Sequence, residues 1–207
     1  TTSHPKDVTS DLIDAHNKCK KLMPLLHLPV QSGSTKILED MNRGHTLEDY
    51  LIKIEKLKNN KPNIKFSSDF IIAYPGETED DFEKTLLLMK KIKFINSYSF
   101  IFSPRPGTPA SNITPVHDKI AKERLFNFQK VADQIKKNYR KKLVNSTARV
   151  LFENKNKKDD KYFGRDEYFN SVIVDSNQNL EGKIKDVKIT QHNQNTLFGE
   201  IILKEKE

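Results

Sequence analysis

The chain has 207 residues and a formal net charge of +8, which comes from 36 Lys and Arg against 28 Asp and Glu. Its length suffices for one large or two small domains. The positive charge favours a polyanionic partner such as nucleic acid, and a lysine-rich solvated surface is the alternative explanation. A single cysteine excludes a disulfide framework and a cysteine-based metal site within the chain. Because no apolar run approaches ~18 residues and no signal-peptide pattern is visible, we expect a cytoplasmic protein without a membrane partner.

The first sixty residues alternate helical and strand patterns. Residues 7–20 carry an apolar helical face that includes Cys19, which we therefore predict to be a buried structural thiol. Residues 25–31 are typical of a short buried strand, and a short helix is expected over 35–42. A further helix is predicted to begin after Thr46, because polar capping residues precede an apolar periodic run there.

The most informative stretch follows as a strand that turns directly into a helix. Residues 70–75 are apolar apart from their final proline, which is typical of a parallel strand covered on both faces. Gly76 ends the strand, and Thr78 with Asp81 three residues later predicts the capped start of a helix. Ligands bind at such junctions in α/β folds, where free backbone N–H groups are presented. An ordinary strand-to-helix turn is the alternative interpretation.

The same alternation continues for one more unit. Residues 97–103 form a third predicted strand, and the loop 104–109 is rich in proline. Three strand–helix units in order predict a parallel sheet with right-handed crossovers, but they are too few for a closed barrel. We therefore expect part of a barrel, continued upstream. A long helix over 119–142 carries nine Lys or Arg against two acids, and it could face nucleic acid or pack on a neighbouring domain.

After Leu143 the pattern changes to short β-rich runs separated by polar turns. This predicts a small antiparallel barrel of the oligonucleotide-binding type, and hence domains at 1–142 and 143–207. Such barrels present basic and aromatic side chains on a curved sheet, although a generic barrel with a charged exterior fits the same pattern. The residues that could form a nucleic-acid face are Arg149, Lys161, Tyr162, Phe163, Arg165, Lys183 and Lys185.

Several motifs together resemble the radical-SAM methylthiotransferases, and most closely the MiaB type, which adds a methylthio group to isopentenylated adenosine beside the tRNA anticodon. The opening Thr-Thr-Ser-His-Pro and the β-rich tail, which is similar to a TRAM domain, extend the resemblance over the whole chain. The motifs that carry it are four, at residues 27–34, 41–44, 69–82 and 103–110.

The resemblance implies a three-part architecture for the family. An N-terminal domain holds an auxiliary iron–sulfur cluster, a radical-SAM barrel holds a second [4Fe-4S] cluster on a three-cysteine motif, and a TRAM domain binds RNA. Neither the motif nor the first domain is found here, so the chain resembles the rear half of the barrel plus the TRAM domain. It is then expected to carry no catalytic residue and no metal ligand, and to be inactive alone. The parent protein would be a monomer that needs an electron donor.

The resemblance also implies what the remaining residues do. In the family a 5′-deoxyadenosyl radical from S-adenosylmethionine (SAM) abstracts hydrogen from adenine and the auxiliary cluster delivers sulfur, while the protein orients and shields. Arg43 would pair with the SAM carboxylate, because a guanidinium fork matches that group. Arg105 would meet an RNA phosphate or the substrate base. The other residues expected to contact SAM are Gln31, Ser32, Ser34, Asp69, Ala73, Tyr74, Pro75 and Gly76.

Two residues depart from the family pattern. Ala73 stands where glycine is usual, and His45 stands where tyrosine is common. Two other functions stay open at this stage: an RNA-binding module without catalysis, and part of an unrelated metabolic barrel enzyme. An incomplete barrel would also leave an open sheet edge and exposed core, so we expect the chain alone to be poorly soluble.

Overall fold

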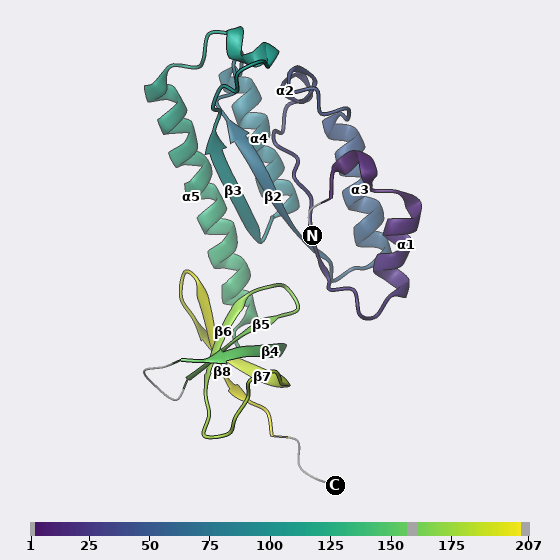
Figure 1. Cartoon of the computed structure of the whole chain (residues 1–207), viewed down its shortest axis with the longest axis vertical. Coiled ribbons are helices and arrows are strands. Elements are labelled where there is room, and N and C mark those ends of the chain that lie inside the picture. The colour runs from purple at the N-terminus through teal and green to yellow at the C-terminus, as the bar shows by residue number, and fades with distance from the viewer. Residues whose placement is uncertain (1–2, 157–160, 204–207) are drawn as a thin grey trace. The chain divides into compact units, whose positions relative to one another are not determined.

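The computed structural model describes residues 3–156 and 161–203 (Figure 1). The chain divides into two compact units, Thr1–Ile135 and Lys136–Glu207. The division falls within helix α5 (Asp118–Leu143), and the domain boundary at 142/143 expected from the sequence stays a prediction. None of the helices in the described ranges is both long and apolar enough to cross a membrane.

The first unit is built on a three-stranded parallel sheet in the order β1-β2-β3 (Figure 1). The predicted parallel strand–helix units are thereby confirmed. The strand expected over 25–31 is shorter than predicted, because regular pairing stops at His27 and only Gln31 forms a further bridge, to Phe70. Pro29 has no N–H to donate to a ladder, which accounts for the early end. The strands are β1 (Leu25–His27), β2 (Lys65–Ile72) and β3 (Asn96–Ile101).

Helices alternate with these strands along the chain in the expected order. Both predicted capping boxes are present, with Thr46 and Asp49 starting α3 and Thr78 and Asp81 starting α4. The helices are η1 (Pro5–Asp7), α1 (Ser10–Lys18), α2 (Thr35–Asp40), α3 (Leu47–Asn60), α4 (Glu79–Ile92), η2 (Pro109–Asn112) and α5.

One face of the sheet is packed into the core. Phe70 of β2 is fully buried, and its ring centroid lies 5.5 Å from that of Phe94 and 4.8 Å from that of Phe128 in α5. The other face is more open, since Tyr98 and Phe100 of β3 are 55% and 60% exposed. Residues 70–75, which were predicted to be covered on both faces, are buried apart from the half-buried Ile71, so the open part of this face lies at β3.

The prediction that Cys19 is buried is wrong. Helix α1 ends at Lys18, and Cys19 follows it as an exposed free thiol. The buried residues of α1 are instead Ile13 and His16. The apolar period that suggested burial of Cys19 extended past the last helical residue, where it no longer describes a common face.

The second unit is a closed five-stranded barrel in the order β4-β5-β6-β8-β7 (Figure 1). The barrel was predicted, but not as a purely antiparallel one: β6 and β8 pair in parallel. The sequence also did not indicate β5. Its Gly164 approaches β4 so closely that a Cβ there would lie 2.5 Å from the Leu151 carbonyl oxygen. The strands are β4 (Thr147–Lys155), β5 (Lys161–Asp166), β6 (Ser171–Asp175), β7 (Ile184–His192) and β8 (Thr196–Ile201).

Candidate functional site

The turn after β2 combines two left-handed residues with buried side chains. Ala73 has φ 60° and Gly76 has φ 82°, while Tyr74 and Pro75 between them are buried. The Tyr74 hydroxyl donates to the backbone carbonyl of Asp40 at 2.9 Å, which ties the turn to the end of α2. The turn therefore has a fixed shape in which backbone groups, rather than long side chains, are presented.

The buried carboxylate of Glu77 is hydrogen-bonded to the start of this turn. The side chain of Glu77 is 1% exposed, and its Oε1 accepts from the Ala73 N–H at 3.1 Å and from Arg124 Nη1 at 2.9 Å. Arg124 of α5 also donates to the Glu77 carbonyl at 3.0 Å and to Glu79 Oε2 at 3.0 Å. Burial raises the pKa of Glu77 to about 7, against the opposing pull of the Arg124 charge. Sequence reasoning missed this pair because its members lie 47 positions apart.

The loop that follows Gln31 is anchored on α4. The Gly33 N–H donates to Thr85 Oγ1 at 2.9 Å, and a Cβ on Gly33 would lie 2.5 Å from the Lys84 carbonyl oxygen. Ser34 Oγ donates to Asp81 Oδ1 at 2.6 Å, and Ser32 Oγ accepts from the Ser34 N–H at 3.1 Å. Both serine hydroxyls, predicted to contact SAM, are thus buried and used within the fold.

Asp81 accepts hydrogen bonds both from this loop and from the start of α4. Its Oδ2 accepts from Thr78 Oγ1 at 2.7 Å and lies 3.6 Å from Lys36 Nζ. Burial alone would raise the pKa of Asp81, but the hydrogen bonds from Ser34 and Thr78 and the Lys36 charge lower it to about 2. Lys36 also donates to the Gly76 carbonyl at 2.8 Å, so the loop and the turn are joined.

Gln31, which follows β1, lies beside Asp69 of β2. The Gln31 N–H donates to the Asp69 carbonyl at 3.0 Å, and Gln31 adopts φ 76° with a half-buried side chain. The Asp69 carboxylate faces His27, with 3.4 Å between Oδ1 and Nε2. His27 Nδ1 lies 2.9 Å from Ser67 Oγ. This polar row lies on the open side of the sheet, in register with Tyr98.

Arg43 lies close to two histidines, His4 and His45. Two buried atoms of these three residues, Arg43 Nε and His45 Nε2, have no hydrogen-bond partner within residues 3–156 and 161–203. The His4 and His45 rings meet edge to face with centroids 5.7 Å apart. Burial, and then the Arg43 charge, lower the pKa of His4; burial also lowers the pKa of His45 and of Arg43. The buried Arg43 Nε–H is a donor, and a buried donor without a partner marks a place where a ligand acceptor is expected. His45 Nδ1 donates to the Arg43 carbonyl at 3.1 Å, so His45 Nε2 is an acceptor.

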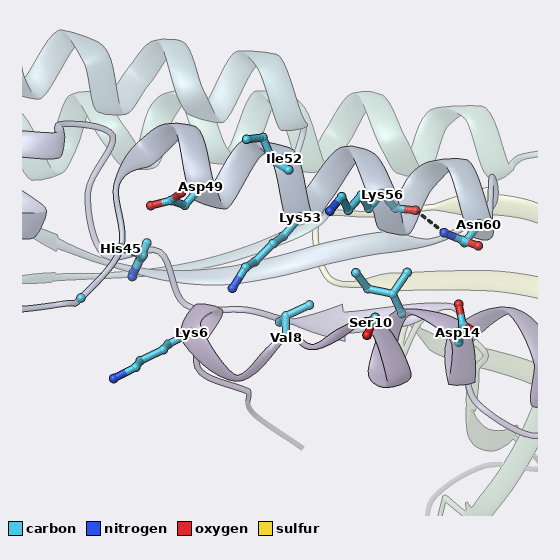
Figure 2. A pocket seen from close by; sticks show the side chains of 12 residues that line it. Lys6, Val8, Ser10, Asp14, His45, Asp49, Ile52, Lys53, Lys56 and Asn60 are labelled. Carbon is cyan, nitrogen blue, oxygen red and sulfur yellow. Dashed lines mark hydrogen bonds between the residues drawn. The ribbon is translucent and has the colours of Figure 1, made fainter.

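A groove of about 390 Å³ opens beside these residues, between α1 and α3 (Figure 2). His45 and Asp49 line one end and Asn60 the other. Lys53 crosses the groove to donate to the Pro5 carbonyl at 2.6 Å, so this lysine serves the fold. The acidic and basic side chains of the groove are mixed, and they give it no single charge preference.

The basic residues predicted to meet RNA are distributed over several places. Arg149 and Lys185 line one hollow of about 820 Å³ on the barrel. Lys183 is exposed nearby in sequence and donates to the Asn179 carbonyl at 2.7 Å. Arg165 is instead held among aromatic rings on β5. In the first unit, Arg105 is exposed in the loop after β3.

Family models match both parts of the chain. A model described as the radical SAM superfamily matches residues 2–89, and a TRAM domain model matches residues 141–202. The chain thus has a radical SAM region followed by a TRAM region. Its fold agrees with that of a solved structure, coproporphyrinogen III oxidase (HemN) from Escherichia coli, a radical SAM enzyme. The two share 14% identity with a TM-score of 0.54, over 80% of this chain and 45% of that one.

Several curated relatives of this chain carry the name tRNA-2-methylthio-N(6)-dimethylallyladenosine synthase. The one from Pelagibacter ubique is 56% identical over 100% of this chain and 46% of its own length. Those from Rickettsia canadensis and Wolbachia pipientis are 48% and 44% identical, over 97% and 96% of this chain and 46% of their own lengths. The chain thus spans about half the length of these relatives, and the resemblance to the methylthiotransferases is confirmed.

A radical SAM region implies SAM and an iron–sulfur cluster in general. The residues present do not fit a cluster: the chain has one cysteine, and no group of three or more His, Cys, Asp or Glu in the described ranges could hold a metal ion. They do fit part of SAM, because the partnerless Nε of Arg43 can donate to a carboxylate.

Proposed function

We propose that this chain is the part of a tRNA methylthiotransferase that orients SAM and engages tRNA. The observation that carries the proposal is the 56% identity to a named methylthiotransferase through the whole chain, with both the radical SAM and TRAM regions matched. The substrate would be isopentenylated adenosine next to the anticodon. When bound, SAM and the clusters supply the radical chemistry and the sulfur.

On the SAM side, this chain contributes binding and orientation. Arg43 donates to the carboxylate of SAM through Nε, which has no partner in the part of the chain that the structure describes. The turn from Ala73 to Gly76 lines the adenine with its backbone, and Gln31 hydrogen-bonds the ribose. Ser32 and Ser34 act indirectly, since their hydroxyls fix the loop that follows Gln31.

On the RNA side, the hollow lined by Arg149 and Lys185 takes a phosphate, and Lys183 and Arg105 add charge-assisted contacts. Phosphate contacts make affinity fall steeply with salt. The cytoplasmic location, the monomeric state and the need for an electron donor stay predictions, and tRNA is the partner that we propose.

The test uses the complete reading frame that contains this chain, expressed in a bacterium that lacks tRNA methylthiolation. We expect mass spectrometry of its tRNA nucleosides to gain the methylthio form of isopentenyladenosine. Replacing Arg43 by Gln should raise the KM for SAM at least several-fold with a smaller change in kcat, because the lost contact is made to bound SAM before reaction. The matched control is Lys90→Gln, an exposed charge change on α4.

The two alternatives make different predictions. A non-catalytic RNA-binding module would yield no modified nucleoside, and its tRNA affinity would survive deletion of residues 1–140. An unrelated metabolic barrel enzyme would bind neither tRNA nor SAM. Absence of product from a protein that carries its clusters and binds both ligands would overturn methylthiolation as the function.

A further inference from the structure

The barrel has a second feature apart from the hollow lined by Arg149. In the order β4-β5-β6-β8-β7, the strands β5 and β6 are the second and third along the chain. Five-stranded barrels of the oligonucleotide-binding type bind their ligands over the face of those two strands. Arg149 lies on β4 and Lys185 on β7, so the hollow that they line belongs to other strands.

The face over β5 and β6 carries a cluster of planar side chains. The guanidinium carbon of Arg165 lies 5.2 Å from the ring centroid of Phe163 and 4.3 Å from that of Phe169. Phe163 pairs with Ile173 of β6, which pairs with Phe198 of β8, so three partly exposed apolar residues lie in one row. We call Phe163, Arg165, Phe169 and Ile173 the β5–β6 platform.

Phe169 is held outward by a rigid turn. It is 56% exposed and adopts φ 64°, a conformation that costs a bulky residue about 1–2 kcal/mol. The buried carboxylate of Asp166 fixes the turn: Oδ1 accepts from the backbone N–H groups of Tyr168 at 2.9 Å and Asn170 at 2.8 Å. An exposed aromatic ring maintained in a strained backbone suggests a function for that ring.

The surroundings of Arg165 favour stacking over phosphate binding. Its Nε lies 3.2 Å from Glu153 Oε1, so its charge is already paired and a phosphate would meet a carboxylate beside it. Aromatic rings and guanidinium planes are the surfaces on which unpaired bases stack. Phe169 presents such a surface to solvent.

We propose that the β5–β6 platform stacks an unpaired nucleobase of RNA, with Phe169 as the main contact. The proposal rests on the proposed function of RNA binding and adds to it a separate site for a base. The hollow with Arg149 and Lys185 then binds backbone phosphate, and the platform binds the face of a base without reading its identity.

The test uses the full chain and a single-stranded RNA of about eight nucleotides that carries 2-aminopurine, whose fluorescence reports stacking. Phe169→Ala should weaken binding about tenfold and abolish the fluorescence change, with an unchanged salt slope. Phe169→Trp should retain both. Arg149→Gln should reduce the salt slope by about one while the fluorescence change remains. Phe126→Ala is the matched control, since Phe126 is 67% exposed on α5 outside the barrel.

Two further measurements keep the outcomes distinct. Phe169→Gly relieves the strained backbone, so this variant should be at least as stable as the wild type. It should nevertheless bind RNA about tenfold more weakly, as Phe169→Ala does. An abasic RNA should bind the wild type and Phe169→Ala equally. Wild-type affinity in Phe169→Ala would overturn the platform and leave RNA binding intact, whereas a wild type that binds no RNA would overturn the proposed function itself.

Discussion

Ala73 adopts a left-handed backbone conformation that is strained for a residue with a side chain. An L-residue at φ 60° costs about 1–2 kcal/mol relative to glycine, which is freer in that conformation but loses more entropy on folding. We therefore expect Ala73→Gly to raise the free energy of unfolding by about 0.5–1 kcal/mol in urea titrations. The matched control, Ala132→Gly within α5, should lower it by about 1 kcal/mol. Equal losses in the two variants would contradict the role of the positive φ.

Glu77 should make the stability depend on pH. Burial raises its pKa from 4.5 to about 7, so the folded protein binds a proton that the unfolded chain releases. The stability that Glu77 contributes is then fully present below pH 4.5 and is lost as pH rises through 7, by roughly 3 kcal/mol in all. Glu77→Gln keeps an acceptor for Ala73 and Arg124 but does not titrate.

The measurement for Glu77 compares urea midpoints of wild type and Glu77→Gln between pH 5 and pH 8. The histidines with lowered pKa values, His4, His16 and His45, give the opposite slope, but they are common to both proteins and cancel in the difference. We expect the variant to gain on the wild type as pH rises. A constant difference across this range would show that Glu77 is ionised throughout.

The motifs indicated Arg43, Gly76 and Asp69 as SAM contacts, and these roles stay predictions. What the sequence could not indicate is which of the neighbouring side chains the fold itself uses. The Ser32 and Ser34 hydroxyls form hydrogen bonds within the fold. Their partners, Thr85 and Asp81, are distant in the chain. A motif indicates which residues are present, but not which of them the fold already occupies.

At the scale of elements, the first turn of α4 has two roles, because it caps the helix and also anchors the loop that contains Ser34. Asp81 caps the helix with Thr78 and also accepts the buried hydrogen bond from Ser34. Asp49 caps α3 with Thr46 in the same way, but it is exposed. Asp81→Ala should therefore cost about 2–3 kcal/mol, as the loss of a cap plus a charged buried hydrogen bond. Asp49→Ala should cost clearly less in the same thermal denaturation, and equal costs would refute the anchoring role.

The elements themselves were predictable where local chemistry decides them. The Thr-x-x-Asp spacing located the starts of α3 and α4 because the cap is formed within four residues. β5 escaped prediction since Gly164 weakens a strand pattern, and the reason for the glycine is the approach of Leu151 from β4. The parallel pairing of β6 with β8 was equally invisible, because alternation along a strand does not specify the direction of its neighbour.

At the scale of the whole chain, the sequence indicated the two kinds of architecture from composition and order. Alternating helix and strand patterns predict a parallel sheet, and uninterrupted β runs predict a barrel. We expected exposed core surface because the predicted barrel is incomplete, whereas the residues of β3 themselves did not indicate that one sheet face is open. Tyr98 and Phe100 are strand formers, and their alternation along β3 is compatible with a buried face. Their exposure therefore follows from the tertiary structure and could not be predicted from the residues of β3.

That exposed face should govern how the chain behaves in solution. Tyr98 and Phe100 share one face of β3, which lies at one end of the sheet order and offers both apolar surface and unpaired backbone groups. We expect concentration-dependent self-association of the 207-residue chain in analytical ultracentrifugation, and its suppression by the double substitution Tyr98→Lys, Phe100→Lys. Phe126→Lys, which removes a singly exposed aromatic from α5 and adds a charge, should leave the association unchanged. A wild-type chain that sediments as a single monomer at all concentrations would show that this face is not a contact surface.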